Sequence, residues 1–150
     1  MNEQKVEPVL SLDDPRLGSV DVDSWCVDIH NLTTPLGPLF VSFIQCGDRA
    51  EVEAHLPVLN SILERLPALW PEAVRFLWEA RAREPRTEET KQRFLAAWTV
   101  MGVGIFSDGS FAIHLCDERE EFKEWFFDHG YWPAVQFSAD GTAEDWTIEG

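Results

Sequence analysis

The chain of 150 residues, 45% of them hydrophobic, has the size and apolar content of one domain whose core needs neither disulfides nor a metal. Its 12 basic and 27 acidic residues give a net charge of −15, which argues against nucleic acids and anionic membranes as partners. The same charge favours solubility and a basic partner.

The negative charge is unevenly distributed along the chain. Residues 49–93 have no net charge, whereas residues 1–48 carry −6 and residues 94–150 carry −9. Two interpretations remain open at this point: the acidic flanks form a solvated surface that only keeps the protein monomeric, or they attract a partner of opposite charge.

The N-terminal part of the chain predicts a tail followed by strands. Residues 1–8 are polar and charged, which is typical of a flexible tail and unlike a signal peptide. Apolar residues alternate with polar ones over 20–22 and 25–29, as in strands. The segment 33–38 has two prolines and a glycine and predicts a loop, and the apolar run 39–46 predicts a central strand.

The segment 48–85 organises the predicted fold, because only here do apolar residues recur at helical spacing over a long stretch. Proline after Leu66 predicts that a first helix ends there, and Pro71 is placed to begin a second one. Pro57 lies inside the first helix and predicts a kink or a division into two. We therefore expect a helical hairpin with one apolar side on each arm, formed by Val52, Leu56, Leu59, Leu63 and Leu66 and by Trp70, Ala73, Val74, Leu77 and Trp78.

The C-terminal half predicts a third, shorter helix and two β-hairpins. The helix spans 86–97, with Thr87 as its cap. Strands at 98–106 and 111–115 are joined by an Asp-Gly turn, and strands at 134–137 and 146–148 by a second Asp-Gly turn. The two glycines within the first of these strands, Gly102 and Gly104, predict the close approach of another element.

The order strands, helices, strands predicts a single α+β domain over residues 1–150. In this fold class an antiparallel β-sheet, made of two β-hairpins and the N-terminal strands, packs against the helical hairpin.

No catalytic, cofactor or metal motif is present. The four histidines have neither the spacing of a helical metal pair nor a cysteine or glutamate partner in a zinc signature, and the known phosphate-loop and nucleophile patterns are missing. We therefore expect a protein that is not an enzyme and has no cofactor. Three cysteines far apart predict free thiols in the cytoplasm, and no apolar run is long enough to cross a bilayer.

The segment 117–132 is the best candidate for a binding surface, because it combines many acidic residues with many aromatic ones. Protein interfaces favour aromatic anchors with charge around them. The alternative is that the aromatic side chains fill space between sheet and helices while the acidic ones face water. The predicted partner-binding residues are Asp117, Glu118, Glu120, Glu121, Glu124, Trp125, Phe126, Asp128, Tyr131 and Trp132.

Several short motifs resemble those of small acidic bacterial proteins of uncharacterised families. They are Asp14-Pro15-Arg16-Leu17-Gly18, Trp25 at the start of a strand, the helical pair, Asp128-His129-Gly130, Val135-Gln136-Phe137 and Asp140-Gly141. Several such families are associated with polymorphic toxin and secretion systems as immunity proteins. The resemblance implies an intracellular α+β protein without catalysis that binds and blocks a toxin, and it implies no functional residues.

These observations predict an immunity protein that neutralises a basic toxin domain, such as a nuclease, through acidic and aromatic surface. The alternative is a regulatory or scaffold domain that binds an endogenous protein. An enzyme with a nonstandard site is a third and weaker alternative, which would need a deep pocket with two or more titratable groups.

Overall fold

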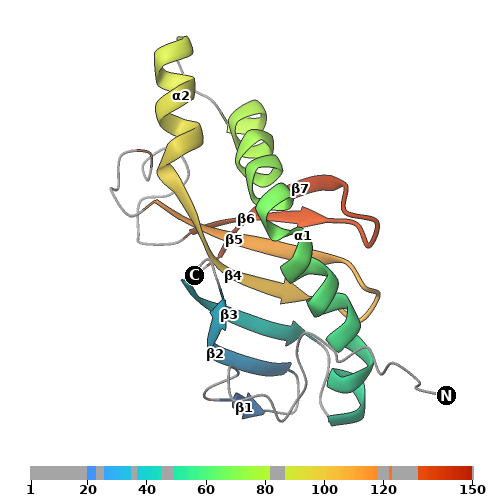
Figure 1. Cartoon of the computed structure of the whole chain (residues 1–150). Helices are drawn as coiled ribbons and strands as arrows, with labels where there is room; N and C mark the ends of the chain where they lie inside the picture. The colour runs from blue at the N-terminus through green and yellow to red at the C-terminus, as the bar shows by residue number, and fades with distance from the viewer. Residues whose placement is uncertain are drawn as a thin grey trace, which may run out of the picture.

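A seven-stranded β-sheet whose strands follow one another in chain order is the main layer of the molecule (Figure 1). The computed structural model describes residues 20–22, 26–34, 37–44, 49–81, 87–117, 122 and 132–149. The predicted tail at residues 1–8 lies outside this part. The elements are β1 (Val20–Val22), β2 (Cys26–Thr34), β3 (Gly37–Ile44), α1 (Arg49–Arg81), α2 (Glu88–Ala97), β4 (Trp98–Ile105), β5 (Phe111–Asp117), β6 (Trp132–Phe137) and β7 (Ala143–Glu149).

All neighbouring strands are antiparallel except β3 and β4, which are parallel. A parallel pair needs a long connection, and here the connection contains both helices. The strands come close together at this junction, since a Cβ on Gly102 of β4 would lie 2.7 Å from the carbonyl oxygen of Phe40 on β3. This contact confirms the close approach predicted from the two glycines.

Helix α1 is a single helix of 33 residues with three prolines inside it. The predicted end of the first helix at Leu66 is therefore wrong, and so is the predicted new start at Pro71. The division at Pro57 is also excluded, while a kink there stays a prediction. The helix continues because its buried side is unbroken across Pro67, with Leu66 and Leu69 both in the core, while the three prolines are exposed.

The C-terminal half of α1 and helix α2 form a helical pair and lie side by side in Figure 1, where α2 projects beyond the strands. Helix α1 crosses one face of the sheet on its way to this pair. The predicted α+β fold class, with a mainly antiparallel sheet packed against helices, is confirmed. The two helices of the pair differ from the prediction, because the second one is α2 and not the second half of the segment 48–85.

Helix α2 begins where the sequence predicts. The Thr87 hydroxyl accepts a hydrogen bond from the amide of Thr90 at 3.1 Å, and Glu88 and Glu89 occupy the first turn. Strand β4 then starts at Trp98 directly after Ala97, without a loop. Helix and central strand are thus one continuous stretch of regular structure.

The two Asp-Gly turns are confirmed at residues 106–110 and 138–142. Gly109 and Gly141 have φ angles of 87° and 91°, which residues with a Cβ rarely adopt. The predicted loop at 33–38 is shorter than expected, because β2 continues to Thr34 and β3 begins at Gly37.

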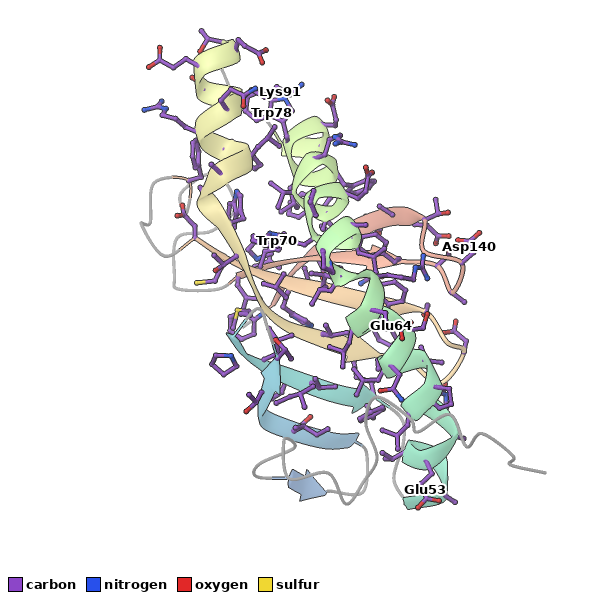
Figure 2. All side chains as sticks on the ribbon, viewed as in Figure 1. Glu53, Glu64, Trp70, Trp78, Lys91 and Asp140 are labelled. Atoms are coloured by element: carbon purple, nitrogen blue, oxygen red, sulfur yellow. The ribbon has the colours of Figure 1, made fainter. Side chains whose placement is uncertain are left out.

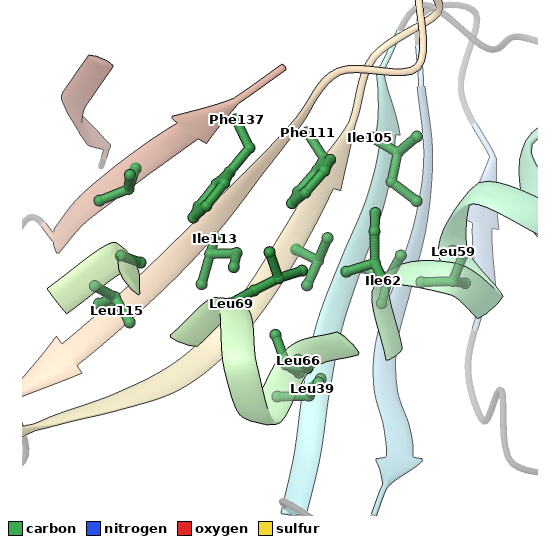
Figure 3. Packing of buried hydrophobic residues seen from close by; sticks show 14 of the residues in the cluster. Leu39, Leu59, Ile62, Leu66, Leu69, Ile105, Phe111, Ile113, Leu115 and Phe137 are labelled. Carbon is green, nitrogen blue, oxygen red and sulfur yellow. The ribbon is translucent and has the colours of Figure 1, made fainter. Parts of the chain in front are cut away.

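The core lies between α1 and the sheet (Figure 3). Residues at every second position of the strands, such as Phe111 and Ile113 on β5, face the helix and are buried. Phe111 and Phe137 stack in parallel on neighbouring strands, with ring centroids 5.1 Å apart. This face of the sheet is therefore covered by one amphipathic helix.

Candidate functional site

Eight of the ten predicted partner-binding residues lie outside the described part of the chain. The structure describes Asp117 and Trp132, which stand at the two ends of the predicted segment, together with Phe122 between them. The residues outside are Glu118, Glu120, Glu121, Glu124, Trp125, Phe126, Asp128 and Tyr131.

Asp117 ends β5 and is buried, with 8% of its surface exposed. Its Oδ2 accepts a hydrogen bond of 2.7 Å from the amide of Phe122. This bond pairs the backbone amide of the buried Phe122 with a carboxylate at the end of β5. Asp117 thus fixes the chain after β5, and its part in partner binding stays a prediction.

Phe122 belongs to the core. It packs edge-on against Phe94 of α2, with ring centroids 5.1 Å apart, and Phe94 also contacts Trp78 of α1 and Trp98 of β4. For this aromatic residue the structure favours the alternative that such side chains fill the space between sheet and helices.

Trp132 begins β6 and is half-buried. Its indole N–H donates a hydrogen bond of 2.8 Å to Nδ1 of His114 on β5. His114 and Ala134 are paired across the two strands, so Trp132 and His114 lie on the face of the sheet opposite α1. Trp132, one of the predicted partner-binding residues, is therefore held in place by His114 on the neighbouring strand.

Among the described residues, the helices and the β-sheet differ in the charges that they carry. Every lysine and arginine in this part of the chain lies on α1 or α2, whereas the strands and the turns that join them carry only acidic charges. The acidic residues of the sheet layer are Asp21, Asp28, Asp108, Asp117, Asp140, Glu144, Asp145 and Glu149.

Two of these acids stand at the hairpin tips and are held by their own turns. The pKa of Asp108 is lowered by hydrogen bonds from the hydroxyl of Ser110, at 2.6 Å, and from its amide. The pKa of Asp140 is lowered by hydrogen bonds from the Ser138 hydroxyl and then from Thr142. Both carboxylates are exposed and ionised at neutral pH.

The surface near these tips is hollowed. One hollow of about 310 Å³ lies between the two hairpins, a second of about 280 Å³ lies between the tips and α1, and a third of about 490 Å³ lies between α1 and the β6–β7 turn. Figure 2 shows Asp140 at the end of the β6–β7 hairpin and Glu64 on the neighbouring face of α1. The sequence predicts the two turns but not these hollows.

The tips are tied to α1 by two contacts. A ring nitrogen of His55 lies 3.1 Å from the carbonyl oxygen of Ser107, and a guanidinium nitrogen of Arg65 donates to the carbonyl oxygen of Asp140 at 3.3 Å. The walls of the hollows are therefore fixed relative to the helix.

Within the described ranges, no three histidine, cysteine, aspartate or glutamate side chains come together in a way that could hold a metal ion. No helix in that part of the chain is both long and apolar enough to cross a bilayer. Cys116 on β5 is half-buried and is not part of a disulfide within the described part of the chain.

The fold and the charges define a small α+β domain in which the described helices carry charges of both signs and the described sheet layer is acidic. No family model, curated protein or solved structure matches the chain.

Proposed function

We propose that this protein is a non-catalytic binding domain that acts as an immunity protein and neutralises a basic toxin domain in the cytoplasm. The observation that carries the proposal is the division of charge: in the described residues, the sheet layer is acidic without a single lysine or arginine. A surface with charge of one sign attracts a partner of the opposite sign and raises the rate of association.

The segment 117–132 supplies further support. It connects β5 to β6 along the chain, and its sequence contains many acidic and aromatic residues. Aromatic side chains supply much of the binding energy at interfaces, while charge around them sets specificity and association rate. A nuclease domain has a basic surface for its substrate, and an acidic protein that covers this surface blocks it.

The test begins with the gene next to the one that encodes this protein. We expect a large open reading frame with a secretion domain and a basic C-terminal module. Co-expression of that module with this protein should restore growth, and the two purified proteins should associate at low salt and more weakly at high salt. If the module is absent, or if the pair does not associate at low salt, the immunity function is rejected.

A regulatory or scaffold domain is the competing function, and charge reversal separates the two. Changing Glu120, Glu121 and Glu124 together to lysine should lower the affinity for the basic module at least about tenfold, mostly through slower association. The matched control reverses Glu88, Glu89 and Glu79 on the helices, where the net charge changes equally. Equal effects of the two triple variants would show that net charge alone acts and would contradict a specific acidic surface.

A further inference from the structure

The hollow between the two hairpins joins residues that are far apart in the sequence. Phe106, Asp108 and Ser110 come from the β4–β5 turn, whereas Gln136, Phe137 and Glu144 come from β6 and β7. The volume of about 310 Å³ is at the lower end of pockets that hold small molecules or large side chains.

The walls of this hollow favour a cation. Asp108 and Glu144 supply two exposed carboxylates, and among the described residues that line the hollow none is basic. The serine hydroxyl and the glutamine carbonyl add further acceptors. The hydrogen bonds from Ser110 keep Asp108 in its charged form.

One aromatic residue of the lining, Phe106, is half-buried, whereas Phe111 and Phe137 pack their rings into the core on the α1 side of the sheet. A guanidinium group is planar, donates five N–H bonds at its edge and packs its face on aromatic rings. A compact ammonium group would use less of this volume and has no planar face to pack on a ring.

We infer that the hollow between the hairpin turns receives an arginine side chain from the basic partner protein, with Asp108 and Glu144 as its acceptors and Phe106 against its face. This inference rests on the proposed function, which supplies the basic partner. It adds the position on the sheet layer at which one side chain of that partner binds. An anchor of this kind at a fixed pocket is typical of interface residues that carry a large share of the binding energy.

The experiment uses a small probe, so that it does not depend on finding the partner. The ¹⁵N-labelled full chain is titrated with N-acetyl-arginine amide, and N-acetyl-citrulline amide serves as the uncharged probe of the same shape. We expect saturable shifts of the amides of Ser110, Gln136 and Glu144 with the arginine probe and none with the citrulline probe.

Two matched variants complete the test. Glu144→Gln should weaken the arginine probe about three- to tenfold, whereas Glu89→Gln on α2 should leave its affinity unchanged. Both residues are exposed, and a dispersed amide spectrum confirms that each variant is folded. Shifts spread evenly over acidic residues, equal binding of citrulline, or equal effects of the two variants would overturn the inference. Such a result would leave the proposed function intact, since that function is tested by the association of the basic module.

Discussion

The indole N–H of Trp132 donates to Nδ1 of His114 across β5 and β6, at 2.8 Å. The imidazole accepts this bond only while Nδ1 carries no proton, so the neutral ring has its proton on Nε2. The pair joins β5 to the residue with which β6 begins.

A double-mutant cycle should detect this bond. His114→Phe and Trp132→Phe should each lower the free energy of unfolding by about 1–2 kcal/mol, and the double variant should lose less than the sum, since either change alone removes the bond. Urea unfolding of the four proteins at pH 8 gives the coupling energy. Additive losses at pH 8 would contradict the bond.

The two glycines of β4 give a matched pair of substitutions. A Cβ at position 102 would lie 2.7 Å from the backbone oxygen of Phe40, whereas at position 104 the nearest atoms are side-chain atoms of His114 and Ile44 at 3.4 Å. Gly102→Ala should therefore lower the free energy of unfolding by about 1–3 kcal/mol, and Gly104→Ala by less. Chemical denaturation measures both, and a larger loss at 104 would contradict the close approach of β3 and β4.

Pro67→Ala should stabilise the protein. Proline in a helix interior costs about 3 kcal/mol relative to alanine, and part of this gain, about 0.4–1 kcal/mol, is offset by the greater freedom of the unfolded chain. We expect a net gain of about 2 kcal/mol in the free energy of unfolding. Pro67→Gly is the control and should gain about 1 kcal/mol less than the alanine variant. A loss of stability in Pro67→Ala would mean that the proline ring makes a packing contact of its own.

The lowered pKa values of the aspartates at the hairpin tips predict that the folded protein loses stability at low pH. Because the pKa of Asp108 is lower in the fold than its ordinary value of 3.8, its contribution is present above that value and is lost as the pH falls through the lower folded value. Asp108→Asn should flatten the dependence of the unfolding midpoint on pH below about 4. Glu64→Gln, at an exposed site on α1, serves as the control for the general effect of acid. An identical pH profile for Asp108→Asn and the wild type would contradict the role of the turn.

Local signals were sufficient for part of this fold. The cap at Thr87 and the turns at Gly109 and Gly141 depend on a few neighbouring residues, and the structure has them where the sequence predicts. The continuity of α1 could not be predicted in this way. Proline at 67 is a strong local stop, and only the sheet beneath Leu66 and Leu69 supplies the burial that offsets its cost.

The same distinction between local signals and long-range contacts applies to the candidate site. Acidity and aromatic content were visible in the sequence, but the hollow between the hairpins combines residues from both turns, and the Trp132–His114 bond joins residues 18 positions apart. Contacts of this kind depend on strand order and register, which no motif in the chain encodes. The parallel pairing of β3 with β4 was missed for the same reason, since it follows from the path of the helices across the sheet.

Because Ala97 ends α2 and Trp98 begins β4, one peptide bond joins a helix to a strand in the middle of the sheet. The indole N–H of Trp70 on α1 donates to the carbonyl oxygen of Trp98 at 3.0 Å, so the long helix is attached at the same point. No loop separates α2 from β4. A force or rotation applied to α2 is therefore transmitted directly to β4. The helical pair and the sheet should therefore move as one rigid body. Mechanical unfolding that starts at α2 should also detach β4 from its neighbouring strands.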